Sequence, residues 1–232
     1  MCFSAEASYI SAAILIPAGS VAIHRAYNKN QKYLALSFLP LLFGLQQLFE
    51  GLIWIGYRSG DQSWVEGFSL AYMFFAWLAW PVWVPFSTFF LEPCRRRYLY
   101  LVFAILGGML GGVQYVPYFA HDNWLVTRVL ENAISYEGTI LFDLIMGREI
   151  TNIVYLFVIL APLLTSSEME ARVFGALLSF VALVTYLVYT HAYVSAFCFG
   201  AALMSAYLLF IVFRKTEDPG HPRQAECRAS AG

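Results

Sequence analysis

The segment from Tyr33 to Tyr57 reads YLALSFLPLLFGLQQLFEGLIWIGY and contains a single charged residue, Glu50. A helix of roughly 20 apolar residues is long enough to cross the hydrocarbon core of a bilayer, so this segment predicts a transmembrane helix. Other segments of the chain are similarly long and apolar. The seven predicted spans are Ala5–Ala26, Tyr33–Tyr57, Phe68–Leu91, Tyr98–Phe119, Glu149–Thr165, Arg172–Thr190 and Tyr193–Phe213.

The composition of the whole chain favours a membrane protein. Of its 232 residues, 60% are hydrophobic, 18% aromatic and 12% charged, and the mean hydropathy is +0.63. Soluble domains carry about 25% charged residues, so this chain has too little charge to cover the surface of a soluble globule. The formal net charge of −1 gives no basis for nucleic-acid binding. We therefore expect a lipid bilayer around the chain.

The last two predicted spans form one apolar stretch that is too long for a single crossing. Its most polar point is Tyr189–Tyr193, so we place a turn there. The N-terminal segment has no basic region before its apolar run, and we expect it to remain as the first span rather than act as a cleaved signal peptide.

The distribution of basic residues predicts the orientation, because Lys and Arg collect on the cytoplasmic side of membrane proteins. With seven spans and an outside N-terminus, only Arg58, Arg128 and Arg148 lie outside, and every other Lys and Arg lies inside. The predicted fold is an all-α, seven-span transmembrane helix bundle with the N-terminus outside and the C-terminus inside. Residues 1–215 form a single transmembrane domain, and 216–232 form a disordered cytoplasmic tail.

The longest connection joins the fourth and fifth spans. We expect Asp122 and Asn123 to cap a short helix that runs through Tyr136 and lies in the membrane interface. Its apolar side would consist of Leu125, Val126, Val129, Leu130 and Ala133.

The second span holds the strongest candidate for a functional site. Glu50, Gln46, Gln47 and Trp54 share one helical face, because residues three and four apart are neighbours on a helix. Ionisable side chains inside membranes are costly and usually functional, which favours an outer-leaflet site that binds a cation, a proton or a polar ligand. The alternative is a protonated Glu50 that forms hydrogen bonds between helices, with the two glutamines doing the same.

Further polar residues fall in the same leaflet, and this asymmetry predicts a cavity that opens to the outside. Gln114 near the outer end of the fourth span and Tyr186 in the sixth complete the predicted ligand-binding set. We therefore predict a protein that binds or transports a small ligand, cation or proton through an outward-facing polar cavity centred on Glu50.

A second hypothesis is a membrane-embedded enzyme with a divalent metal, or with Cys2 as nucleophile, at the outer surface. The candidate metal ligands are Cys2, Glu6, His121 and His191, although no HExxH, CxxC or HxxxH spacing joins them. Without an HxxxH pair, a zinc hydrolase of the ceramidase or progestin-receptor type is not expected.

Two other cofactors are not expected. A retinal Schiff base needs a lysine in the last span, and the chain's lysines, Lys29, Lys32 and Lys215, lie elsewhere. Haem is disfavoured because no two histidines lie at one depth within the spans.

A third hypothesis is a structural or accessory subunit without catalysis. Gly107, Gly108, Gly111 and Gly112 form two overlapping GxxxG registers in the fourth span. Such glycines let helices approach closely, so they predict a homo-oligomer or a membrane partner.

Two segments also resemble a known group of proteins. The opening Met1–Ser8, which reads MCFSAEAS, and Leu42–Gly51, which reads LFGLQQLFEG, resemble an uncharacterised family of bacterial multi-pass membrane proteins that begin Met-Cys-Phe-Ser-Ala. The resemblance implies a multi-pass protein of the bacterial inner membrane and supplies no activity.

Overall fold

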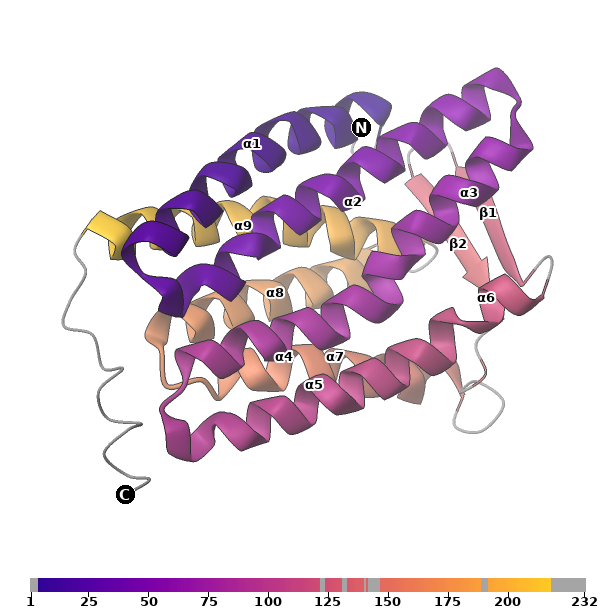
Figure 1. Cartoon of the computed structure of the whole chain (residues 1–232). Helices are drawn as coiled ribbons and strands as arrows, with labels where there is room; N and C mark the ends of the chain where they lie inside the picture. The colour runs from indigo at the N-terminus through magenta and orange to yellow at the C-terminus, as the bar shows by residue number, and fades with distance from the viewer. Residues whose placement is uncertain are drawn as a thin grey trace.

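A computed structural model describes residues 4–121, 124–130, 133–139, 141, 147–188 and 192–217. The described residues form helices that run side by side, with a two-stranded hairpin at one end of the bundle (Figure 1). The elements are α1 (Ala5–Lys29), a 3₁₀ turn (Gln31–Tyr33), α2 (Leu34–Ser59), α3 (Gln62–Met73), a π-helical turn (Phe74–Ala79), α4 (Trp80–Leu91), α5 (Cys94–Tyr115), α6 (Pro117–Ala120), β1 (Leu125–Leu130), β2 (Ala133–Gly138), α7 (Arg148–Leu164), α8 (Met169–Val188) and α9 (Tyr193–Glu217).

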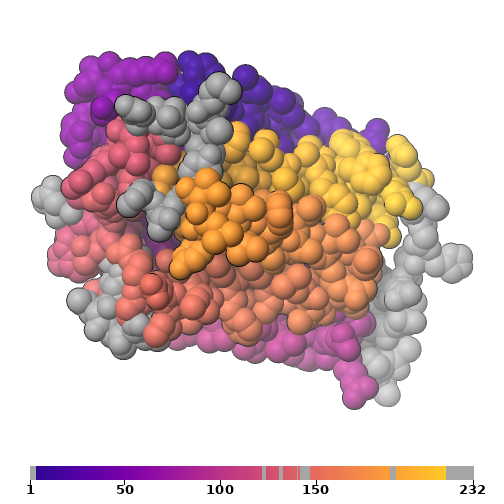
Figure 2. All heavy atoms as spheres, turned by 180° about the vertical axis from the view of Figure 1, so that it is seen from behind, coloured from indigo at the N-terminus to yellow at the C-terminus, as the bar shows by residue number. Residues whose placement is uncertain are grey.

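Among the described residues, six helical segments are long and apolar enough to cross a membrane, and each overlaps one of the predicted spans. The break predicted near Tyr189–Tyr193 is confirmed, since α8 ends at Val188 and α9 begins at Tyr193. The fifth predicted span corresponds to α7, whose 17 residues extend over about 26 Å. It packs against α4, α5 and α8, and Figure 2 shows α7, α8 and α9 on the rear face of the bundle.

The third predicted span begins earlier than expected and contains a π-helical turn. Asp61 caps α3 by accepting a hydrogen bond from the Trp64 N–H at 3.0 Å, so the helix begins at Gln62 rather than Phe68. The π-helical turn comes just before Pro81, which has no N–H to donate to the preceding turn. One of the turn's carbonyls, that of Ala76, accepts a hydrogen bond from the Tyr155 hydroxyl on α7.

One of the two glycine registers in α5 is used inside the chain. A Cβ atom at Gly107 would lie 1.9 Å from the Pro81 carbonyl oxygen, and one at Gly111 would lie 2.3 Å from that of Trp77. The backbones of α5 and the α4 segment therefore touch at these two glycines. Gly108 meets its nearest neighbour at 3.5 Å, and Gly112 has nothing within 4 Å. The predicted binding of a partner by this stripe stays a prediction.

The all-α prediction is wrong for the connection after α6, where a hairpin replaces the expected interfacial helix. β1 and β2 pair antiparallel, with Leu125 opposite Gly138 and Leu130 opposite Ala133. Burial alternates along β1, as it does in a strand with one covered face. Its residues include several β-branched side chains, which fit a pleated strand better than a helix. Asp122 and Asn123, the expected helix cap, lie outside the described residues.

The other end of the bundle, which we call the basic end, carries Arg95–Arg97 and the last turn of α9. Glu168 in the α7–α8 connection accepts a hydrogen bond from Lys32 at 2.5 Å. Glu92 is buried and accepts from the Ser166 hydroxyl at 2.5 Å and the Ser167 N–H at 2.7 Å. These bonds join three interhelical connections. Helix α9 continues to Glu217, two residues into the predicted tail, whose remainder, 218–232, lies outside the described residues.

Candidate functional site

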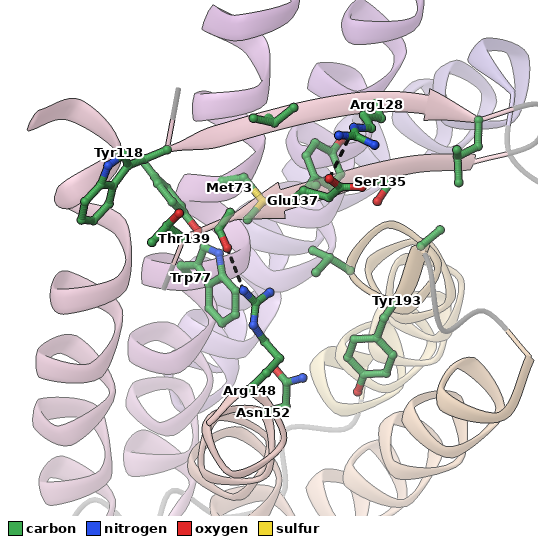
Figure 3. A pocket seen from close by; sticks show the side chains of 17 residues that line it. Met73, Trp77, Tyr118, Arg128, Ser135, Glu137, Thr139, Arg148, Asn152 and Tyr193 are labelled. Carbon is green, nitrogen blue, oxygen red and sulfur yellow. Dashed lines mark hydrogen bonds and ion pairs between the residues drawn. The ribbon is translucent and has the colours of Figure 1, made fainter. Parts of the chain in front are cut away.

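A cavity of about 730 Å³ lies at the hairpin end of the bundle. Its walls come from the hairpin, from α6, from the π-helical turn and from the N-terminal ends of α7 and α9. Ligand cavities in proteins typically have about 300–1,000 Å³, so this one is large enough for a small organic molecule. Figure 3 shows polar side chains from different elements around it.

The hairpin forms a two-faced wall, because successive side chains of a strand point to opposite sides. Val126, Arg128 and Leu130 line the cavity, as do Ser135 and Glu137 on the paired strand. The Arg128 guanidinium forms an ion pair with the Glu137 carboxylate, with an N–O distance of 3.4 Å (Figure 3).

The opposite face of the hairpin packs on α3. Thr127 donates a hydrogen bond to the buried Ser69 hydroxyl at 2.7 Å. The Tyr136 ring stacks on the Tyr72 ring, with 4.7 Å between ring centroids. These contacts fix the position of the wall relative to the bundle.

The N-terminal ends of α7 and α9 supply the polar groups across from the hairpin. Arg148 reaches from the first turn of α7 toward β2 and donates to the Gly138 carbonyl at 2.8 Å (Figure 3). Asn152 lies one turn further along α7, and Tyr193 begins α9. The cavity lining therefore contains an amide and a phenol in addition to the Arg148 guanidinium.

A smaller void of about 30 Å³ lies against the floor of the cavity and shares Trp77, Asn152 and Tyr193 with it. One water molecule needs about 10–15 Å³, and a buried water needs polar partners. The void has Asn152, Tyr155 and Tyr193 for that purpose, and its inner wall includes Cys198. It therefore extends the cavity toward the middle of the bundle.

The predicted acid, Glu50, lies in a hydrogen-bonded network below this void. Its side chain is 1% exposed. One carboxylate oxygen accepts a hydrogen bond from the Ser195 hydroxyl on α9. The other oxygen accepts from the Gln47 amide at 3.1 Å. Both oxygens therefore have donors without any contribution from solvent.

Gln46 connects α4 to Cys198, which lines the small void. Its carbonyl oxygen accepts from the Trp80 indole N–H at 3.1 Å, and its amide donates to the Cys198 sulfur at 3.3 Å. Cys198 lies one helical turn from Ser195 on α9. The contacts of Gln46 and those of Glu50 thus lie about one helical turn apart between α2 and α9.

Tyr136 lies between the cavity and this network. Burial raises the pKa of its hydroxyl well above the ordinary value, and the Glu50 carboxyl and Cys198 thiol contribute in the same direction. The phenol therefore stays protonated at physiological pH and keeps its O–H available as a donor.

A family model matches residues 1–224, nearly the whole chain. The chain belongs to DUF6629, a family of unknown function. No curated protein and no solved structure matches it. This membership agrees with the expected uncharacterised family and brings no activity with it.

In this member of DUF6629, the predicted ligand-binding residues do not gather around one cavity. Gln46, Gln47 and Glu50 are buried together, but none of them lines the cavity. Trp54 and Gln114 are buried elsewhere, with the Trp54 indole N–H and both Gln114 amide atoms unpartnered in the described structure. Tyr186 is 61% exposed on the surface of α8.

The predicted metal ligands likewise either lie apart from one another or fall outside the described residues. Glu6 is exposed and lies 3.6 Å from Arg58, and His121 stacks on Trp124. Cys2 and His191 lie outside the described residues. Within the part of the chain that the structure describes, no three His, Cys, Asp or Glu side chains are grouped in a way that could hold a metal ion.

The cavity residues that the sequence-based prediction omitted are mainly those of the hairpin and of α7. Arg128 and Arg148 were identifiable as two of the three basic residues on the predicted outer side. The sequence could not show that these two arginines line one cavity, because that depends on the hairpin, and residues 122–136 were predicted to form a helix instead.

Proposed function

We propose that the chain is a seven-span protein of the bacterial inner membrane that binds a small ligand in the cavity at its hairpin end. The observation that carries this proposal is the cavity itself, whose volume of about 730 Å³ suits a small organic molecule. Its lining combines aromatic rings with a few polar groups, which is typical of ligand sites. The hydrogen-bonded network below the cavity favours transport of the ligand in addition to binding.

The seventh span in this proposal is α7. Support comes from its position among α4, α5 and α8 and from its apolar sequence, which holds charged residues only in its first turn. With seven spans, the hairpin faces outward and the basic end faces the cytoplasm, as the positive-inside rule favours.

In this proposal, Glu50 is the polar element beneath the site rather than its centre. The small void brings the cavity to Cys198, and Ser195, one turn away on α9, donates to the carboxyl group of Glu50. Buried carboxyl groups of this kind serve as proton or ion relays in membrane transporters.

A cavity-filling experiment tests the binding function. Val194 lines both the cavity and the void, so Val194→Trp fills them, whereas Val188→Trp places the same side chain at an exposed position on α8 that lines neither. The purified full chain in lipid nanodiscs is screened by saturation-transfer NMR against a library of small organic fragments. We expect fragments that bind the native chain and Val188→Trp but not Val194→Trp. Hits that bind all three proteins equally would contradict the proposal.

A further inference from the structure

We infer that the buried Glu50 carboxyl group is a proton-binding site, which takes up and releases a proton while the Gln47 amide turns to match its state. This inference rests on the proposed function, since it names what the polar element beneath the cavity binds. It starts from the surroundings of the acid. Glu50 is 1% exposed, and among the described residues it forms no ion pair. Its charge, when present, is therefore stabilised by neutral groups.

Two hydrogen bonds stabilise the ionised form. The Ser195 hydroxyl donates to Oε1 of Glu50, and the Gln47 amide donates to Oε2 at 3.1 Å. A hydrogen bond to a charged acceptor is stronger than one to a neutral acceptor, so both bonds favour the carboxylate. Burial opposes them, because the loss of water disfavours the charged form of an acid. The two effects are of similar size. The ionised and protonated forms are therefore close in free energy.

Gln47 carries the acceptor that the protonated form needs. Its Oε1 atom is buried and has no partner among the described residues, although its Nε2 atom contacts Glu50. A buried acceptor without a partner carries a desolvation cost. The oxygen and nitrogen ends of a side-chain amide are similar in size, so a half-turn of the amide exchanges their positions. A protonated Glu50 then donates its new O–H to the Gln47 oxygen. The same two side chains are thus hydrogen-bonded to each other in both states.

The other titratable groups around the carboxyl group are neutral near physiological pH. Those that interact with it are Tyr72 on α3, Tyr136 on β2 and Cys198 on α9. Helix α1 contributes Tyr9, which packs against the glycine that follows Glu50. Phenols and thiols ordinarily ionise above physiological pH. These four groups therefore supply no charge that would hold Glu50 in one form.

Space for water lies within about one helical turn of this site. The small void has about 30 Å³, more than the roughly 10–15 Å³ that one water molecule needs. Its wall includes Cys198, which lies about one turn along α9 from Ser195, the donor to the carboxyl group. A proton therefore has only a short distance to cross between the void and the acid.

A metal cation is the main competing occupant. The oxygens of Glu50, Gln47 and Ser195 are of the kind that bind hard cations. Such an ion needs several oxygen ligands around a space of its own. Neither the cavity nor the small void has Glu50 in its lining, and one carboxylate oxygen already accepts from the Ser195 hydroxyl. A proton needs no such space, so the geometry favours a proton over a metal ion.

Infrared difference spectroscopy tests the inference on the full chain in lipid nanodiscs without a ligand. A protonated carboxyl group absorbs at a higher frequency than a carboxylate, so its band reports protonation as the pH changes. We expect a band that disappears with rising pH around a midpoint near neutrality and that is missing from Glu50→Gln. The midpoint should be the same in sodium, calcium and tetramethylammonium chloride of equal ionic strength. A Glu50 that keeps one form throughout, or a midpoint that depends on the metal ion, overturns the inference.

Two variants distinguish a turning amide from a fixed one. Ser195→Ala removes a donor to the charged form, so the midpoint should rise by about one pH unit, a tenfold gain in proton affinity. Gln47→Met keeps a side chain of similar length and removes both ends of the amide, which stabilise opposite states. Its midpoint should therefore move less than about half as far. Equal shifts would make Gln47 a fixed donor and overturn the inference. A shift in Ser195→Ala also identifies the Glu50 band if Glu50→Gln does not fold.

The inference and the proposed binding function can fail separately, because the titration is measured without a ligand. If fragments distinguish Val194→Trp from Val188→Trp but Glu50 does not titrate, the cavity is a binding site and only the proton site is wrong. If Glu50 titrates as expected but no fragment distinguishes the two variants, the proton site stands and the binding function is wrong.

Discussion

Glu50 is kept inside the bundle by two side-chain donors, one from its own helix and one from α9. Ser195 and Gln47 together satisfy both carboxylate oxygens, and neither donor is exposed to solvent. A buried acceptor that loses its donor keeps its desolvation cost. The Ser195 hydroxyl therefore stabilises the fold through Glu50.

This contact predicts that Ser195→Ala lowers the free energy of unfolding by about 1–2 kcal/mol. An average interhelical hydrogen bond in a membrane protein contributes about 0.6 kcal/mol, and we expect more here because no water is available to replace the hydroxyl. The measurement is unfolding of the purified chain by titration with SDS in mixed micelles.

Ser205→Ala is the matched control for this prediction. Ser205 is as deeply buried on the same helix, but its hydroxyl donates only to the Ala202 carbonyl of its own helix. Its removal should change stability by less than about 0.5 kcal/mol. Equal losses for the two variants would show that Ser195 acts only as a packed side chain.

At the level of single residues, the sequence predicted which side chains are buried better than it predicted their hydrogen-bonding partners. The three- and four-residue spacing put Gln46, Gln47 and Glu50 on one face, and all three are buried. What surrounds that face depends on Ser195, which lies 145 residues further along the chain. No local pattern specifies such a pairing, so the sequence could not tell a buried hydrogen-bonded acid from one that faces an open cavity.

At the level of elements, helices were predictable because twenty consecutive apolar residues leave few alternatives. The hairpin was not, because strand and helix periodicities are hard to tell apart over six residues. Val126 and Val129 favoured a strand, but the same two residues also fitted the apolar side of a short helix. The hairpin supplies one wall of the cavity, so the error in this element displaced the predicted site as well.

The contact between α5 and the α4 segment gives the prediction at this scale. Gly107→Ala should destabilise the chain by about 1–3 kcal/mol, because its methyl group would collide with the Pro81 carbonyl and the backbone cannot move away without unpacking the helices. The measurement is again SDS titration, with circular dichroism as the readout.

Gly112→Ala controls for the change of glycine to alanine within the same helix. Its methyl group would enter open space, and alanine favours helix over glycine by up to about 1 kcal/mol. We therefore expect no loss of stability, or a small gain. A loss at Gly112 as large as that at Gly107 would mean that this side of α5 is also covered, which would support the predicted partner.

At the level of the whole molecule, the two ends of the bundle have different chemistry. The hairpin end holds the cavity, and the only basic residues described there are Arg58, Arg128 and Arg148. At the basic end, ion pairs join neighbouring helices, such as that between Lys215 on α9 and Glu170 on α8, whose Nζ and Oε1 atoms lie 2.8 Å apart. In a bilayer, this asymmetry favours a cytoplasmic basic end.

Two exposed serines at opposite ends allow a direct test of this orientation. Ser63 lies at the start of α3 near the hairpin end, and Ser167 lies in the α7–α8 connection at the basic end. In intact cells of a bacterial expression host, a membrane-impermeant maleimide should label Ser63→Cys above the background of the native cysteines. It should label Ser167→Cys only after the membrane is permeabilised. The reverse pattern would place the cavity on the cytoplasmic side, and labelling of both in intact cells would mean that the two ends do not lie on opposite sides of the membrane. A fluorescent protein fused after Gly232 gives an independent readout, because the positive-inside arrangement requires that it fold and fluoresce in the cytoplasm.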